Sequence, residues 1–370
     1  MNTELSHFAA RLCGRISNFQ SPISDCQFSE LALELFVLQF QCNLAYRKIC
    51  EARNLTPATV KDWTQIPAVP TGAFKELELT SLAPDERTTV FHSSGTTEQK
   101  PSRHFHSAES LAVYEASLWW HFQFAIANLQ SPDKLAIGNW QLAILTPPPE
   151  QVPHSSLVHM FEVVRQKVGA TESVFLGRLA NDGSWTLNFD KTLLALSDNA
   201  KFKTQNSKLI LGTAFSFVHL LDYLVERDLR VVLPAGSRVM ETGGYKNRSR
   251  ILPKAELHAL IEKFLGVPSE NIVCEYGMSE LSSQAYDSEI QNSKRWFRFP
   301  PWARVQIISP ETGREVGEGE TGLIRILDLA NVFSVAAIQT EDLGIRRSDG
   351  FELVGRAQLA EPRGCSLMAA

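Results

Sequence analysis

The 370-residue sequence lacks the features of several specialised classes of protein. Its longest uncharged runs contain His, Gln and Asn and stop short of the roughly 18 apolar residues that a membrane span requires. Its N-terminal segment carries charges within an apolar stripe, which does not resemble a secretory signal. The formal net charge of −5 argues against nucleic-acid binding, which needs a concentrated basic face. We therefore expect no membrane span and no nucleic-acid partner.

Cysteine is also sparse, and it forms no CxxC pair. A chain of this length can bury a large core without disulfide crosslinks. We therefore expect reduced thiols and a cytoplasmic location. The cysteines are Cys13, Cys26, Cys42, Cys50, Cys274 and Cys365.

Helix and strand patterns alternate along the first 300 residues. This rhythm predicts an α/β fold with mostly parallel sheets flanked by helices. The length predicts more than one lobe, because single cores stop growing near roughly 250 to 300 residues. The expected elements are a mostly apolar helix over 28–49, a helix over 107–126 with Ser107 as N-cap, a strand, turn and helix over 207–228, a strand over 229–236, a helix over 252–266 with Pro253 in its first turn and Gly266 as its stop, and a strand and loop over 271–281.

The pattern of apolar and polar residues changes after residue 300. Two alternating segments flank a turn rich in Gly and Glu, which predicts a small antiparallel β module. We expect an α/β core with two sheet lobes over 1–300, the small β module over 301–356, and a C-terminal tail over 357–370.

Three polar clusters follow apolar segments. The first, "SSGTTE" over 93–98, comes after Val90 and Phe91. Hydroxyl groups and backbone N–H groups turned by a glycine form an anion-binding concavity, which a polyphosphate fits. The alternative is a polar surface turn.

The second cluster is "CEYGMSEL" over 274–281, where Ser279 and Glu280 stand beside Gly277. A carboxylate there could hold Mg²⁺ together with phosphate oxygens, and the alternative is a solvated loop end. The third is "TEDLGIRRSDGFELVGR" over 340–356. Asp342 could accept both hydroxyls of a ribose and Arg356 could neutralise phosphate, whereas the alternative is a β-turn with a solvated Asp.

Taken together in this order, the three motifs resemble those of the adenylate-forming superfamily, which includes acyl-CoA synthetases and luciferases. "SSGTTEQKP" resembles the phosphate loop of that superfamily, "EYGMSE" its YGxTE motif, and "TEDLG" with "GFELVGR" its TGD and GR motifs. Further segments, "IPAVPTGAFKELEL", "ETGGYKNR" and "PRGCSL", resemble the LuxE-type acyl-protein synthetases. The resemblance covers nearly the whole chain and implies the N-terminal-domain fold of adenylate-forming enzymes.

The resemblance assigns roles to individual residues. It implies that Glu280 binds Mg²⁺, that Ser279 contacts the α-phosphate or the acyl carboxylate, and that Asp342 holds the ribose with help from Arg356. The residues that it places around the ATP phosphates are Ser93, Ser94, Gly95, Thr96 and Thr97, and those that it places along the adenine are Gly243, Gly244, Tyr276 and the adjoining Gly277.

The sequence also departs from the superfamily pattern. Glu98 and Glu341 replace glycines, and "PSRH" lacks the usual Pro-Lys. The chain stops at Ala370, where relatives continue into a mobile C-terminal domain with a catalytic lysine, so we expect that domain to be absent. The cation that replaces the lysine could be Lys100, Lys246, Arg363 or a residue of a partner.

The C-terminal segment "AEPRGCSLMAA" carries Cys365. An acyl-adenylate offers a good leaving group that a thiolate displaces, and Arg363, two residues before the cysteine, could favour the thiolate form. The resemblance implies that Cys365 carries the acyl group before an acyl reductase receives it, whereas the alternative is an inert tail cysteine.

The leading hypothesis is thus an acyl-protein synthetase that uses ATP and Mg²⁺ to activate a fatty acid, expected to be long-chain, and acylates its own cysteine. One alternative keeps the adenylation but sends the acyl group to coenzyme A or a carrier protein. The other is a non-catalytic subunit of a reductase complex that binds acyl groups or nucleotides.

Overall fold

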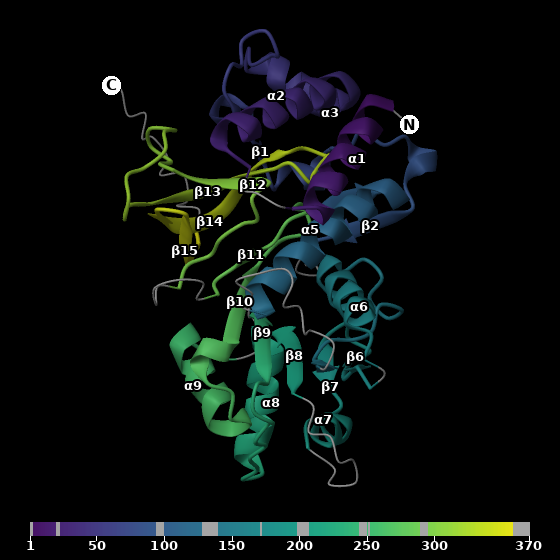
Figure 1. The fold of residues 1–370 in the computed structure, drawn as a ribbon, viewed down its shortest axis with the longest axis vertical. Coiled ribbons are helices and arrows are strands. Elements are labelled where there is room, and N and C mark those ends of the chain that lie inside the picture. The colour runs from purple at the N-terminus through teal and green to yellow at the C-terminus, as the bar shows by residue number, and fades with distance from the viewer. Residues whose placement is uncertain are drawn as a thin grey trace, which may run out of the picture.

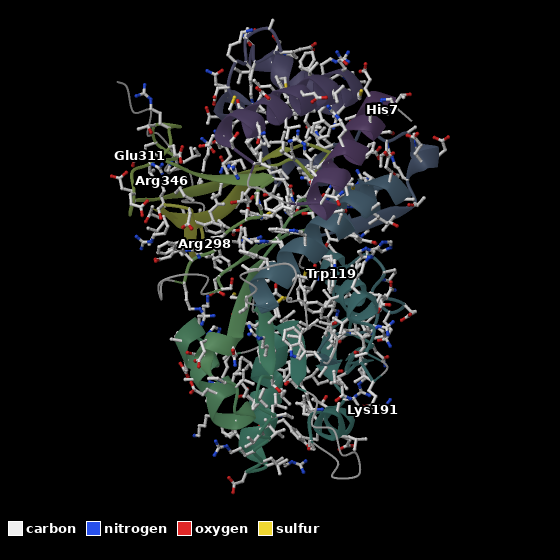
Figure 2. The ribbon with its side chains drawn as sticks, viewed as in Figure 1. His7, Trp119, Lys191, Arg298, Glu311 and Arg346 are labelled. Atoms are coloured by element: carbon white, nitrogen blue, oxygen red, sulfur yellow. The ribbon has the colours of Figure 1, made fainter. Side chains whose placement is uncertain are left out.

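The computed structural model describes residues 3–19, 23–93, 100–127, 140–170, 172–197, 207–243, 250, 252–288 and 295–357. The molecule is elongated, with three N-terminal helices and an antiparallel sheet at one end and a larger sheet with its helices at the other (Figure 1). His7 and Lys191 mark the opposite ends, and Trp119 lies between them (Figure 2).

The larger sheet has six strands, and all neighbours are parallel except β11, which runs antiparallel to β10. In spatial order its strands are β11 (Ala285–Tyr286), β10 (Ile272–Tyr276), β9 (Arg238–Thr242), β8 (Lys208–Thr213), β4 (Gln141–Ile144) and β5 (Val174–Phe175).

Helices cover both faces of this sheet. Successive side chains of a strand point to opposite faces, so apolar residues on both faces need to be buried. On β8, Leu209 and Leu211 pack in the cluster that includes residues of α5 and α6, whereas Ile210 packs in the cluster with α8 and α9. The helices are α5 (Ala108–Ala127), α6 (Ser156–Val168), α7 (Phe189–Leu196), α8 (Ala214–Glu226) and α9 (Lys254–Leu265). The parallel arrangement brings the carboxyl ends of β8, β9 and β10 to one edge.

The second sheet has five strands, four of which form an antiparallel meander late in the chain. They are β12 (Ala303–Ile308), β13 (Thr321–Asp328), β14 (Ala337–Arg347) and β15 (Gly350–Arg356), with β1 (Val69–Pro70) added in parallel to β14. The N-terminal helices share a hydrophobic core with this sheet, and they are α1 (Thr3–Ser17), α2 (Asp25–Cys42) and α3 (Leu44–Ala52).

Short elements complete the described part of the chain. Two hairpins stand apart from the main sheets, formed by β2 (Thr89–His92) with β3 (Arg103–His106) and by β6 (Gly177–Leu179) with β7 (Trp185–Leu187). The remaining helical elements are α4 (Ala73–Glu76) and the 3₁₀ turns Trp63–Gln65, Pro84–Glu86 and Ser269–Asn271.

The predicted helix over 28–49 is in fact two helices that meet at Asn43. The backbone of Asn43 is extended, with φ −103° and ψ 95°, and its side chain caps α3 by accepting a hydrogen bond from the N–H of Tyr46. The same side chain donates to the carbonyl oxygen of Ser334 at 3.4 Å. An asparagine that finds partners in a cap and in a neighbouring segment favours the break.

The strand predicted over 229–236 is wrong. The segment has no regular secondary structure and ends in a turn at 235–236. The N–H groups of Val231 and Leu233 donate to the carbonyls of Phe264 and Leu265 at the end of α9, and Val232 is 67% exposed. An apolar run of this length does not specify its pairing partner. The strand at this place in the sheet is β9, which follows it.

Two predicted helix boundaries are confirmed, and a third is shifted by one residue. Ser107 caps α5 by accepting a hydrogen bond from the N–H of Ser110 at 3.2 Å. Gly266 ends α9 in the left-handed region, at φ 68°, which favours glycine. Pro253 precedes the first helical residue instead of lying in the first turn.

Candidate active site

The loop that follows β10 carries the second polar cluster. Tyr276 ends the strand, and Gly277 begins the loop. A Cβ atom added to Gly277 would lie 2.3 Å from Oε1 of Glu275, so a side chain cannot be accommodated there without displacing that carboxyl group. The glycine therefore leaves room for the Glu275 carboxyl group where the chain leaves the strand toward Ser279 and Glu280.

Both of these residues are buried, with Ser279 5% and Glu280 4% exposed. The Glu280 carboxylate accepts one hydroxyl hydrogen bond on each oxygen, from Ser102 to Oε1 at 2.5 Å and from Ser279 to Oε2 at 3.0 Å. A carboxylate oxygen can accept more than one such bond. The arrangement thus fixes the orientation of the carboxylate and leaves acceptor capacity on each oxygen.

Ser102 connects this loop to the first polar cluster. Its N–H donates to the hydroxyl of Ser93 at 3.0 Å, and its carbonyl oxygen accepts from the N–H of Ser93 at 3.3 Å. Ser102 and Glu280 are 178 positions apart in the chain, so one serine joins two clusters that are distant in sequence. Ser102 was missed by sequence reasoning, because the segment "PSRH" drew attention only for the lysine that it lacks.

His104 supports the same loop from β3. Its Nδ1–H donates to the carbonyl oxygen of Ser279 at 2.5 Å, and burial lowers the pKa of His104 to about 4. The imidazole is consequently neutral near pH 7, with its proton on the nitrogen that faces the loop.

The third cluster meets the end of β10 from the other side. The Tyr276 hydroxyl donates to Oδ2 of Asp342 at 2.9 Å, and Nε of Arg356 lies 3.6 Å from Oδ1. Asp342 and Arg356 face each other across the β14–β15 ladder, next to an irregularity at which Gly355 adopts φ +143°. Burial raises the pKa of Asp342, although its bonds to Tyr276 and Arg356 oppose the shift.

Glu275 is a further buried carboxyl group that sequence reasoning missed. It ends a register-matched row of side chains formed with Thr213 and Thr242 across β8, β9 and β10. Burial raises the pKa of Glu275 to about 7, and a hydrogen bond with Thr242 partly opposes the shift. A glutamate within a strand has no local sequence signal, because its burial depends on the helices that cover the sheet.

Of the remaining predicted residues, the structure describes Gly243 and Lys100. Gly243 directly follows β9, and a Cβ atom added there would meet no atom within 4 Å, so its packing does not require a glycine. Lys100 lies 3.4 Å from Glu76 on the surface. The residues Ser94, Gly95, Thr96, Thr97, Gly244, Lys246, Arg363 and Cys365 lie outside the described residues.

The described residues contain no group of three or more His, Cys, Asp or Glu side chains arranged to hold a metal ion. Mg²⁺ keeps several waters and takes one or two carboxylates together with phosphate oxygens. A single oriented carboxylate such as that of Glu280 fits this pattern. Within the same part of the chain, the helices are too short or too polar to span a bilayer.

The arrangement of two sheets around this site occurs in solved ligase structures. The fold is that of adenylate-forming ligases, as expected from the sequence. A 2-hydroxyisobutyryl-CoA ligase in the postadenylation state with 2-HIB-AMP is similar with a TM-score of 0.65 and 14% identity, over 90% of this chain and 67% of that chain. An open conformation of the ligase with 2-HIB-AMP and CoA gives a TM-score of 0.64 and 13% identity, over 90% of this chain and 74% of that chain.

The family is defined by sequence. The model of the family described as "Acyl-protein synthetase, LuxE" matches residues 18–370, so the chain belongs to the LuxE acyl-protein synthetase family. Two similar proteins are the long-chain-fatty-acid–luciferin-component ligases of Aliivibrio fischeri and Vibrio harveyi. They are 26% and 24% identical, over 92% of this chain in each case and 87% and 86% of theirs. The protein is thus an ATP-dependent ligase.

Proposed function

We propose that the protein activates a long-chain fatty acid with ATP, acylates its own Cys365 and passes the acyl group to an acyl reductase. The observation that carries the activation step is the meeting of Ser93, Ser279 and Glu280 through Ser102, because it joins a phosphate-loop segment to a carboxylate suited to Mg²⁺. The substrate class follows the names of the two relatives.

In the first step, a carboxylate oxygen of the fatty acid attacks the α-phosphorus of ATP and pyrophosphate leaves, which gives acyl-AMP. Ser93 and the adjoining loop residues 94–97 bind the phosphates, and Ser279 contacts the α-phosphate or the acyl carboxylate. Glu280 would hold Mg²⁺, which would supply positive charge to offset that of the phosphate oxygens. Lys100, Lys246, Arg363 or a partner residue supplies the further cation.

The nucleoside lies between the ends of β9 and β10 and the middle of β14. Asp342 accepts hydrogen bonds from the ribose hydroxyls, and Arg356 assists from the neighbouring strand. Tyr276, Gly277, Gly243 and Gly244 line the adenine. The Tyr276 hydroxyl already holds Asp342 at 2.9 Å, so it orients the group that receives the ribose.

In the second step, the Cys365 thiolate attacks the acyl carbonyl carbon and AMP leaves, which gives a thioester on the protein. The reductase then receives the acyl group. We place the reaction in the cytoplasm, where the thiol stays reduced. In this proposal residues 1–300 form the catalytic core, residues 301–356 contribute the ribose site and residues 357–370 carry the acyl group.

The test supplies labelled fatty acid, ATP and Mg²⁺ to the wild type, to Cys365→Ser and to Cys26→Ser. Cys26 is an exposed thiol on α2 and serves as the matched control. We expect Cys365→Ser to keep the carboxylate-dependent exchange of pyrophosphate into ATP and to lose the hydroxylamine-sensitive label, because a serine hydroxyl without a base is a poor nucleophile.

Label that persists on Cys365→Ser, or that is lost with Cys26→Ser, overturns the self-acylation step. Label that appears only on added coenzyme A would identify a CoA ligase. Absence of pyrophosphate exchange in the wild type would indicate the non-catalytic subunit.

A further inference from the structure

The connection between β13 and β14 is buried along its entire length. We call residues 328–336 the bracket, and every one of them is buried. Connections normally run over the surface, because a buried loop must satisfy its polar backbone groups internally. The bracket does so with polar side chains of its own and of its neighbours, and those side chains lead to the Glu280 loop.

Asp328, at the start of the bracket, binds the loop that follows Glu280. One carboxylate oxygen accepts from the N–H groups of Ser282 at 3.0 Å and Ser283 at 2.8 Å. The other accepts from the Ser283 hydroxyl at 2.7 Å and from the N–H of Ala330 at 3.0 Å. The side chain is completely buried, so these four bonds are made without competition from solvent.

Asn331 binds the same loop closer to the proposed metal ligand. Its amide donates to the carbonyl oxygen of Glu280 at 2.8 Å, and its oxygen accepts from the Ser282 hydroxyl at 2.6 Å. The backbone of Glu280 is therefore held by Asn331, whereas among the described residues the hydrogen bonds to its carboxylate come from the hydroxyls of Ser102 and Ser279.

The far side of the bracket is bound by helix α2. The Gln39 amide donates to the carbonyl oxygens of Asn331 at 2.7 Å and Val332 at 3.1 Å, and its oxygen accepts from the N–H of Ala336 at 3.0 Å. Gln39 is as buried as Asp328, but all three of its bonds go to the bracket backbone and none to the Glu280 loop.

We propose that Asp328 and Asn331 are positioning residues that hold the Glu280 carboxylate in the orientation required for Mg²⁺. The inference rests on the proposed role of Glu280 in metal binding. A bound metal needs the carboxylate at a fixed distance from the phosphate oxygens, and a loop that has lost its backbone anchors holds that distance poorly. The bracket thus acts through Glu280 and touches neither nucleotide nor metal.

The experiment compares Asp328→Ala, Asn331→Ala and the control Gln39→Ala in pyrophosphate exchange at increasing Mg²⁺, with thermal unfolding of each. Loss of a hydrogen bond to a charged or buried group changes an equilibrium constant by about tenfold or more, and here that equilibrium is Mg²⁺ binding. We expect Asp328→Ala and Asn331→Ala to raise the half-saturating Mg²⁺ concentration about tenfold, with a smaller change of kcat at saturating metal. Gln39→Ala should lower the Tm and leave the Mg²⁺ requirement unchanged.

Asp328→Asn tests the same point with less disruption. Its amide oxygen can still accept from the loop N–H groups, but its NH₂ group faces the N–H of Ala330, so we expect an intermediate Mg²⁺ requirement. If Asp328→Ala does not fold, Asp328→Asn and Asn331→Ala decide the question by the same criterion.

If the half-saturating Mg²⁺ concentration rises as much in Gln39→Ala as in the bracket variants, the rise reflects a general loss of stability and the proposal is overturned. Glu280→Gln separates the metal-binding role of Glu280 from the positioning role of the bracket. If the half-saturating Mg²⁺ concentration rises in Glu280→Gln but is unchanged in the bracket variants, only the positioning role of the bracket is overturned. An unchanged requirement in Glu280→Gln overturns the metal assignment itself and the proposal with it.

Discussion

The two ends of the candidate site differ in how firmly their acidic residues are held. At one end, Glu280 is buried, both its oxygens accept hydroxyl hydrogen bonds, and its backbone carbonyl oxygen is bound by Asn331. At the other, the Asp342 side chain is 19% exposed, and the Arg356 side chain beside it is 80% exposed.

In the proposed function, this difference suits the two ends to different roles. The Glu280 end is organised before substrate arrives, which suits a group that must place a metal and phosphate oxygens accurately. The Asp342 end is open on one side, which suits a group that exchanges water for ribose hydroxyls when a nucleotide binds. We call the Glu280 end the closed end and the Asp342 end the open end. Substitutions at the closed end should reduce activity more than equivalent substitutions at the open end.

The largest effect is expected for Glu280→Gln. The amide keeps the shape of the side chain but loses its charge, and a charged contact is worth about 3 kcal/mol at the upper end, or roughly a hundredfold. We expect the Mg²⁺ concentration for half-maximal pyrophosphate exchange to rise about a hundredfold, with nucleotide binding in the absence of metal nearly unchanged. Glu275→Gln, a buried carboxyl on the adjoining strand, should leave that Mg²⁺ concentration as in the wild type.

The second prediction concerns Glu275 and the dependence of folding stability on pH. The pKa of Glu275 is raised from 4.5 to about 7, so the folded state holds this proton more tightly than the unfolded state. Its contribution to stability is complete below about pH 4.5 and is lost as the pH rises through about 7. We expect wild-type stability relative to Glu275→Gln to fall by up to about 3 kcal/mol from pH 4.5 to pH 8.

Urea unfolding of both proteins at several pH values measures this difference. Glu270→Gln removes an exposed carboxyl group from the turn before β10 and should follow the wild type. A constant difference between wild type and Glu275→Gln across this range would mean that Glu275 is not a buried, protonated group.

The third prediction concerns the open end. Asp342→Ala removes the proposed acceptor for the ribose hydroxyls, but water reaches this partly exposed side of the site and replaces part of the lost interaction. We expect the KM for ATP to rise about tenfold, near the lower limit for a hydrogen bond to a charged group. The half-saturating Mg²⁺ concentration should stay constant. A change in the Mg²⁺ requirement as large as that of Glu280→Gln would contradict the distinction between the two ends.

The residues that the sequence predicted for the site stand in short contiguous motifs. Ser279 and Glu280 follow a glycine at the end of a strand, and Asp342 stands in a recognisable motif, so local pattern and family resemblance are sufficient to propose them. The α/β fold was predictable for a similar reason, because the alternation of helices and strands is read along the chain.

The residues that hold the motifs together were not predictable in this way. Asp328 and Asn331 act on a loop about 50 residues away, and nothing in their own neighbourhood indicates a partner. The same limit explains the strand wrongly predicted over 229–236, whose N–H groups bond to the end of α9. A single sequence shows which segments are apolar or polar, but not which segments they meet.

The smallest effect is expected for Arg356→Ala. The guanidinium Nε lies 3.6 Å from Asp342 Oδ1, and a side chain that is 80% exposed is well solvated without its partner. Ion pairs of this kind are worth about 0 to 1 kcal/mol, so the KM for ATP should rise less than about fivefold at low salt. The effect should shrink further at about 0.5 M salt, because screening shortens the Debye length to a few ångströms. Arg356→Lys should restore most of the wild-type value if the arginine acts as a charge. An effect of Arg356→Ala as large as that of Asp342→Ala, and insensitive to salt, would mean that Arg356 becomes buried against the nucleotide and that the open end closes when ATP binds.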